Sequence, residues 1–181
     1  MLVSGRAFEE IVQATPDRKL ELYDGEIREK PTMTIGHNRM QAKLLFELSV
    51  RLKGKPFEVR MGQAPVRRSA RNYYLPDVYV VPRHPVSAAL DTFEMFRKPL
   101  PFVAEIWSPS TGRYDIDEKL PGYQERGDRE IWRLHPFAPA LTAWRRQPDG
   151  QYLEMTVHSG KVELHALPGV IIDLDDLFDL D

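Results

Sequence analysis

Hydrophobic positions recur with helical spacing in the stretch from His37 to Leu52. From Met40 to Leu52, every fourth residue is methionine or leucine, so these side chains share one face of a helix. Gly54 follows and is typical of a helix end. A shorter helix is predicted over Gly5–Ala14, where apolar residues also gather on one side. The pattern therefore predicts two helices in the first third of the chain.

Strands are predicted where apolar residues alternate with polar ones or run together between turn formers. The first two form a hairpin over residues 20–29, because Asp24-Gly25 suits a tight primed turn. Further strands are expected at residues 57–61, 64–68, 75–82, 102–107 and 129–135 and, in short alternating stretches, between residues 140 and 165. A mobile connection is expected at residues 83–100, and a brief element at residues 170–178 closes the chain.

A third helix is predicted between two of these strands, over residues 117–127. Asp117 is suited to cap it, Pro121 falls in its first turn, and Gly127 ends it. The order of helices and strands indicates a mixed α/β fold built on one sheet. At 181 residues, the chain is expected to form one domain, residues 1–181, with a core of its own.

Composition limits the class of protein but not its activity. Apolar residues make up 42% and charged residues 29% of the chain, as in ordinary soluble proteins, and no apolar stretch approaches a membrane span. The absence of cysteine excludes disulfides, zinc–thiolate sites and cysteine nucleophiles. Acidic residues come too early in the chain for a secretory signal, so the cytoplasm is the expected location. The net charge of −2 gives no general attraction to nucleic acid.

Two acidic residues interrupt strands that are otherwise apolar: Asp77 in PDVYVV and Glu105 in FVAEIW. An ionised carboxylate is costly to bury unless it is paired, hydrogen-bonded or bound to a metal. If the two strands are neighbours, both carboxylates can converge on one Mg²⁺ or Mn²⁺ ion, because these cations prefer oxygen ligands. Lys119, at the start of the following helix, could return across the sheet to the same point. Such a set suits cleavage of a phosphodiester bond, in which the metal activates water and the lysine balances developing charge.

The same residues also have purely structural interpretations. An aspartate that follows proline at the start of a strand often bonds to nearby backbone, and a partly buried glutamate often pairs with an arginine. Lys119 by itself is more often a solvated helix residue. Spacing alone does not decide between these interpretations and a shared metal site.

An ordered set of segments gives the chain a family resemblance: ELYDGEI, a helix that opens at GHN, PDVYVV, AEIWSPST, EKLPGY and REIW. From about residue 18 to residue 178, the chain resembles the putative restriction endonuclease family within the PD-(D/E)XK nuclease superfamily. The resemblance implies a restriction-endonuclease-like core, a mixed central sheet flanked by helices, with extra C-terminal β-strands. It also implies that Asp77 is the motif aspartate and Glu105 the motif acid. Trp107 stands where the superfamily has a lysine, and the resemblance implies that Lys119 on the next helix replaces it.

His37 and Glu26 are further candidates for this site. His37 opens the long helix, where its imidazole could hydrogen-bond the scissile phosphate or a carboxylate of the site, or could merely cap the helix or face solvent. Glu26 follows the hairpin turn. It either faces solvent or, because the resembling family carries an acid in this DGE position, supplies a third acidic ligand to the metal.

The leading hypothesis is a Mg²⁺-dependent endonuclease that hydrolyses phosphodiester bonds in DNA, without membrane association. The resemblance also implies a homodimer, so that two strands can be cut, and Arg67, Arg68 and Arg71 could contact a nucleic-acid backbone. The alternative is a binding or regulatory protein that keeps the nuclease fold with weak or absent catalysis, which Trp107 and the acidic net charge favour. A metal-dependent hydrolase of another phosphodiester is a third hypothesis. Because fold does not fix function, the substrate rests on analogy.

Overall fold

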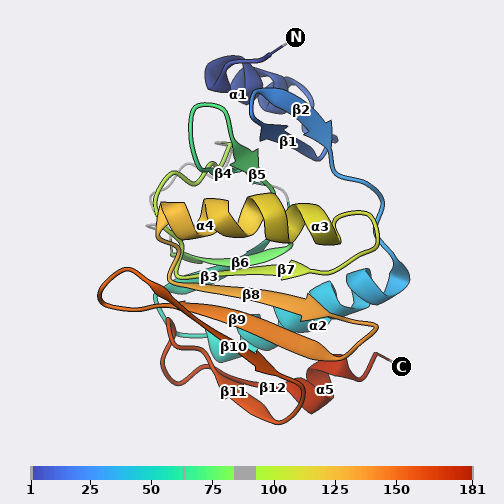
Figure 1. The fold of residues 1–181 in the computed structure, drawn as a ribbon, viewed down its shortest axis with the longest axis vertical. Coiled ribbons are helices and arrows are strands. Elements are labelled where there is room, and N and C mark those ends of the chain that lie inside the picture. The colour runs from blue at the N-terminus through green and yellow to red at the C-terminus, as the bar shows by residue number, and fades with distance from the viewer. Residues whose placement is uncertain (1, 63, 84–92, 181) are drawn as a thin grey trace.

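A computed structural model of the protein describes residues 2–62, 64–83 and 93–180, whose elements are labelled in Figure 1. The helices are α1 (Gly5–Ala14), α2 (Ile35–Arg51), α3 (Gly112–Tyr114), the π-helical segment η1 (Asp115–Lys119), α4 (Leu120–Arg126) and α5 (Leu174–Phe178). The strands are β1 (Leu20–Tyr23), β2 (Glu26–Glu29), β3 (Phe57–Met61), β4 (Val66–Arg67), β5 (Tyr73–Tyr74), β6 (Val78–Pro82), β7 (Phe102–Ile106), β8 (Glu130–His135), β9 (Ala140–Arg146), β10 (Tyr152–Val157), β11 (Lys161–Glu163) and β12 (Ile171–Asp173). A helix with the length and hydrophobicity of a membrane span is not found among these described residues.

Within the described residues, six strands form the central sheet in the order β10-β9-β8-β7-β6-β3. Strands β7 and β8 run parallel, and the other neighbouring pairs in this sheet run antiparallel. The helical segment α3–η1–α4 connects β7 to β8, because a parallel pair needs a crossover rather than a tight turn. Figure 1 shows α3 and α4 running alongside the sheet, with the last three strands and α5 at the opposite end of the molecule from α1. The central sheet is mixed and flanked by helices, as predicted. The expectation of one sheet is wrong, because a four-stranded and a two-stranded sheet are also present among the described residues.

Alternate residues of β7 face two separate layers. Phe102, Ala104 and Ile106 join the core that contains the buried methionine and leucines of α2. Val103 instead joins a second core, which contains side chains of α4. Successive side chains of a strand point to opposite faces, so Glu105 shares the α4 side with Val103. This alternation places the motif acid beneath the helical crossover.

A smaller sheet, β2-β1-β5-β4, packs with α1 at the N-terminal end of the molecule (Figure 1). The hairpin between β1 and β2 turns at Asp24 and Gly25, which have φ angles of 47° and 84°. Positive φ at both central residues is the signature of the primed turn that the sequence predicted. This sheet matters for function because β1 and the segment after β2 both contribute side chains to the buried polar cluster described below.

The helix after β7 differs from the prediction for residues 117–127. Helical structure begins at Gly112, and Asp117 lies inside η1, so it is not the cap. Pro121 does fall in the first turn of α4, and Gly127 ends that helix in the left-handed conformation. A π-helical turn holds more residues than an α-helical turn. In this segment both Asp115 and Lys119 are buried.

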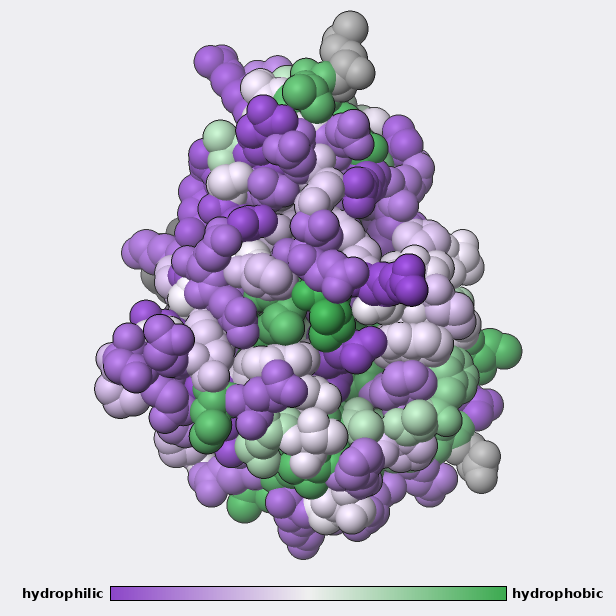
Figure 2. All heavy atoms as spheres, viewed as in Figure 1, coloured by the Kyte–Doolittle hydropathy of each residue, from purple (hydrophilic) through white to green (hydrophobic). Residues whose placement is uncertain are grey.

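Other boundaries shift by a few residues. Helix α2 begins at Ile35, two residues before the expected start, because the hydroxyl of Thr34 accepts the N–H of His37 at 3.2 Å and caps the helix. The strand predicted at residues 75–82 begins at Val78, so Asp77 precedes it. Residues 84–92 of the connection expected to be mobile lie outside the described residues. Figure 2 shows that one face of the molecule is covered mainly by hydrophilic side chains, with smaller hydrophobic patches between them.

Candidate active site

The carboxylate of Asp77 is held by three groups at the start of β6. Its Oδ1 lies 2.6 Å from Nζ of Lys30, while its Oδ2 lies 2.9 Å from Nε2 of His37 and accepts the N–H of Ile106 at 2.8 Å. Burial would raise the pKa of Asp77, but the charge of Lys30 and the hydrogen bond with His37 outweigh burial and hold that pKa well below its usual range. Asp77 is therefore an ionised carboxylate in a buried ion pair.

Glu105 contacts Lys119, the lysine that was expected to lie near it. Oε1 of Glu105 lies 3.2 Å from Nζ of Lys119 and accepts the hydroxyl of Tyr123 at 2.5 Å. The same Nζ lies 2.9 Å from Oε1 of Glu21 and 3.6 Å from Oδ1 of Asp115. The side chain of Lys119 is only 1% exposed. It is therefore not a solvated helix residue, and it joins three carboxylates.

The pKa values of Glu105, Asp115 and Lys119 depend on two opposing effects, burial and the charges of neighbouring side chains. Burial raises the pKa of Glu105 to about 8, with Asp115 and Asp77 adding to the effect and Lys119 opposing it. Burial also raises the pKa of Asp115, again against the charge of Lys119. For Lys119 itself, burial would lower the pKa, but the surrounding carboxylates hold it well above its usual value. Lys119 is thus a permanent cation next to an acid that protonates easily.

The backbone of Leu75 joins the two halves of the site. Its N–H donates to Oε1 of Glu21 at 2.8 Å, and its carbonyl accepts from Nζ of Lys30 at 2.9 Å. The side-chain amide of Gln41 also donates to the carbonyl of Asp77 at 2.8 Å. We refer to the buried polar side chains that meet here as the acid–lysine cluster: Glu21, Lys30, His37, Asp77, Glu105, Asp115, Lys119 and Tyr123.

The cluster contains four of the five residues proposed from the sequence. Asp77, Glu105, Lys119 and His37 are brought together, and His37 contacts a carboxylate of the site, one of the roles expected for it. Glu26 is not brought in, because its side chain is exposed on β2 and makes no described hydrogen bond or ion pair with the cluster. The acid that this hairpin contributes is Glu21, from the neighbouring strand.

Besides Tyr123, which lies one turn beyond Lys119, three cluster residues were not among the candidates from the sequence: Glu21, Lys30 and Asp115. Glu21 lies between two buried leucines of β1, which is the signal that identified Asp77 and Glu105. Asp115 lies four residues before Lys119, a spacing that places two side chains of a regular helix side by side. Lys30 lies in a segment without periodic pattern, so no local signal could have found it.

Several buried polar atoms in and around this cluster make no hydrogen bond within the described part of the chain. Among the described residues, the buried side-chain atoms that lack a hydrogen-bond partner are Nδ1 of His37, the hydroxyl of Tyr114, Oδ1 of Asp115 and Nε of Arg133. His37 and Asp115 belong to the cluster, Tyr114 precedes Asp115, and Arg133 lies beside Glu105 in the register of β7 and β8. Buried polar groups normally find partners, so their concentration here indicates capacity for a polar ligand.

Trp107 occupies the position where the superfamily has a lysine, and its contacts are aromatic. Its indole stacks on His135 with ring centroids 4.3 Å apart and meets the edge of Phe137 at 6.0 Å. A Cβ added at Gly112 would lie 2.2 Å from Nε1 of Trp107, so the start of α3 packs directly against the indole. This side chain holds the helical crossover in place and carries no charge to the site.

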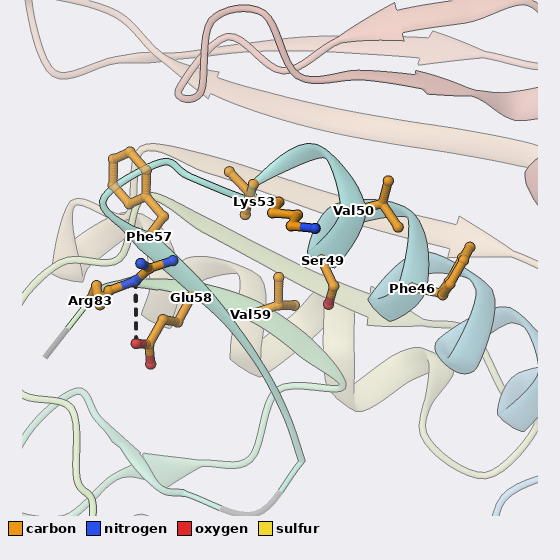
Figure 3. Close-up of a pocket in the computed structure, with 9 residues that line it drawn as sticks. Phe46, Ser49, Val50, Lys53, Phe57, Glu58, Val59 and Arg83 are labelled. Carbon is orange, nitrogen blue, oxygen red and sulfur yellow. Dashed lines mark ion pairs between the residues drawn. The ribbon is translucent and has the colours of Figure 1, made fainter.

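A surface groove of about 450 Å³ between α2 and β3 lies apart from this chemistry (Figure 3). Its walls are mostly apolar, and its polar contacts include an ion pair of 3.6 Å between Arg83 and Glu58. None of the acid–lysine residues lines it. The candidate site is therefore the buried cluster and not this larger groove.

Comparison with known proteins gives a family match and a solved structure of similar fold. The model of the Uma2 family, described as "Putative restriction endonuclease", matches residues 7–175. The crystal structure of a putative nuclease from Anabaena variabilis ATCC 29413 has a TM-score of 0.76 and 15% sequence identity over 98% of each chain. No curated protein matches the chain. The structural likeness confirms the predicted restriction-endonuclease-like fold.

Proposed function

This chain belongs to the Uma2 family of putative restriction endonucleases, and from that premise we propose that it is a Mg²⁺- or Mn²⁺-dependent endonuclease that hydrolyses phosphodiester bonds in DNA. One observation carries the proposal. Two buried carboxylates, Asp77 and Glu105, lie at neighbouring strands, and a buried Lys119 contacts the second of them. Buried charges are costly to keep, and groups with strongly shifted pKa values gather at functional sites.

The donor set fits a hard divalent cation. Mg²⁺ is commonly bound by one or two carboxylates, with water and substrate phosphate as the remaining ligands. No group of three or more acidic or histidine side chains among the described residues forms a ready-made metal cage. Oδ1 of Asp115 is buried and makes no hydrogen bond with a described residue, although it lies 3.6 Å from Nζ of Lys119. Oε2 of Glu105 receives no hydrogen bond among the described residues. Asp77 and Glu105 would hold the ion, and Asp115 lies on the same side.

The cluster residues have distinct roles in this proposal. A bound divalent ion supplies a Lewis acid for the phosphate and lowers the pKa of a coordinated water. His37 and the N–H of Ile106 fix Oδ2 of Asp77, while Tyr123 fixes Oε1 of Glu105. Lys119 orients the nucleophile or stabilises charge that develops on the phosphate. Its long stem lets the ammonium exchange one carboxylate partner for a phosphate oxygen.

The substrate and assembly follow from the family rather than from a contact in this chain. DNA is the substrate that a restriction-endonuclease-type family favours, and a homodimer would supply a second site for the second strand. A cytoplasmic location belongs to the same proposal.

A second candidate function is binding or regulation without catalysis. The observation that favours it is the pairing of each central acid with a lysine: Asp77 with Lys30 and Glu105 with Lys119. Such a network can persist as a structural feature without a metal.

Cleavage assays separate the two candidates. Purified protein would be incubated with supercoiled and linear DNA in Mn²⁺, Mg²⁺ or EDTA, next to Glu105→Gln and the matched control Asp17→Asn, an exposed carboxylate. We expect cleavage in Mn²⁺ by the wild type and the control, and none by Glu105→Gln or in EDTA. Cleavage that persists in Glu105→Gln would indicate a contaminating nuclease, and no cleavage by any protein would favour the binding function.

A further inference from the structure

Lys30 is a second buried lysine of the acid–lysine cluster, and the sequence analysis assigned no role to it. Its side chain is 7% exposed. Its Nζ lies 2.6 Å from Oδ1 of Asp77 and 2.9 Å from the carbonyl of Leu75. The remaining oxygen of Asp77 already receives His37 and the N–H of Ile106. The ammonium of Lys30 therefore lies at the oxygen of Asp77 that His37 and Ile106 do not contact.

Formal charges in the cluster leave room for one divalent cation. Its four carboxylates, when ionised, exceed its two ammonium groups by two negative charges. One Mg²⁺ or Mn²⁺ ion would balance this difference. A second ion would reverse it and leave two uncompensated positive charges in a buried site, which is strongly unfavourable.

Many nucleases instead use two metal ions about 4 Å apart, which together hold the attacking and leaving oxygens. In such sites a shared aspartate bridges two cations. Here one of the two positions next to Asp77 is filled by an ammonium of the chain itself, while Oε2 of Glu105 receives no hydrogen bond among the described residues.

We propose that Lys30 acts as a built-in cation that takes the place of a second metal ion, so that the cluster binds one divalent ion per chain. The inference rests on the proposed function, because it assumes that Asp77 and Glu105 bind metal. Lys30 is then a specificity-determining residue, because its charge sets the number of divalent ions that the cluster binds. The position of its ammonium next to Asp77 also places a positive charge where a second ion would otherwise contact the phosphate.

Counting bound Mn²⁺ tests the inference without an activity measurement. Wild type, Lys30→Met and the control Lys19→Met would be titrated with MnCl₂ by calorimetry, and free Mn²⁺ would be measured by electron paramagnetic resonance. Lys19 is exposed, and its backbone carbonyl accepts the N–H of Lys30, so the two lysines are neighbours. Lys19→Met therefore removes one positive charge close to Lys30 and leaves the ammonium of Lys30 in place. We expect one ion per chain in wild type and Lys19→Met, and two in Lys30→Met.

The outcomes separate this inference from the proposed function. Two ions in the wild type would overturn the role of Lys30 even if Lys30→Met failed to fold. One ion in both wild type and folded Lys30→Met would overturn it as well. Lys30→Arg, which keeps the positive charge, should bind one ion, and two ions in that variant would count against the inference. No binding by any of the proteins would overturn the proposed function, and this inference with it.

Discussion

Nζ of Lys119 lies 3.2 Å from Oε1 of Glu105, across 14 residues of chain. The strand β7 supplies the acid, and the crossover helix that follows returns the lysine over the same face of the sheet. The superfamily places this lysine two residues after the acid, where this chain has Trp107. The contact therefore supports the expectation that a lysine from the next helix replaces the missing one.

Lys119→Met should lower the rate of DNA cleavage by roughly two orders of magnitude, the scale for loss of one group that stabilises transition-state charge. The variant should also unfold more easily, because three buried carboxylates lose their shared cation. Single-turnover cleavage in Mn²⁺ measures the first effect, and urea denaturation measures the second. Lys119→Arg retains the charge and should be destabilised less. Full cleavage activity in Lys119→Met would remove this residue from the mechanism.

Asp77→Asn should lower the free energy of unfolding by about 3 kcal/mol, because it leaves the ammonium of Lys30 buried without a charged partner. The double variant Asp77→Asn/Lys30→Met should recover part of that loss, since it removes both members of the pair. Urea denaturation of the wild type, both single variants and the double variant in EDTA gives the coupling free energy. Additive effects, or an Asp77→Asn variant as stable as wild type, would contradict a strong pair.

The central acids could be predicted because a charge inside an apolar strand is a local anomaly that the sequence displays. Glu21 was overlooked although two buried leucines flank it, since polar and apolar alternation is also typical of a strand with one face in solvent. Lys30 gives no local signal at all. Its contact with Asp77 spans 47 residues and depends on how the small sheet packs on the central one.

The features of the fold that could be predicted depend on residues close in sequence, whereas the feature that could not be predicted depends on tertiary contacts. The stripe on α2, the Asp24-Gly25 turn and the end of α4 at Gly127 depend on neighbouring residues, and each was predicted. The π-helical segment η1 was not, because no local pattern specifies it. Its geometry depends on tertiary contacts, among them the packing of Gly112 against Trp107 and the burial of Lys119.

The stability of the metal-free protein should decrease as pH rises toward 8. The pKa of Glu105 is about 8 in the folded protein, above its ordinary value of 4.5, so the folded state binds this proton more tightly than the unfolded state. The stabilisation is complete below pH 4.5 and is lost as the pH approaches 8, at a rate of at most about 1.4 kcal/mol per pH unit.

Glu105→Gln removes this proton-linked contribution. Its stability relative to wild type should therefore rise steadily between about pH 5 and 8, and urea denaturation in EDTA at several pH values measures the difference. Asp17→Asn serves as the control, because an exposed carboxylate has little effect on this difference. A constant difference between Glu105→Gln and wild type across the range would mean that Glu105 titrates normally.

Glu21 and Glu26 offer a direct comparison between the acid that the structure places in the cluster and the acid that the family position suggested. Glu21 accepts the N–H of Leu75 and lies 2.9 Å from Nζ of Lys119, whereas Glu26 is exposed on the neighbouring strand. Glu26→Gln should therefore leave the affinity for Mn²⁺ within about twofold of wild type, because a solvent-screened charge contributes little.

Glu21→Gln should instead lower the free energy of unfolding by roughly 1 to 3 kcal/mol, because it weakens a buried hydrogen bond to a charged group. It should also slow cleavage, since Lys119 loses one of the carboxylates that position it. Calorimetric titration with Mn²⁺ and urea denaturation of both variants test these expectations together. A tenfold loss of Mn²⁺ affinity in Glu26→Gln, with Glu21→Gln unchanged, would restore Glu26 as the third acidic ligand and contradict the arrangement described for β1 and β2.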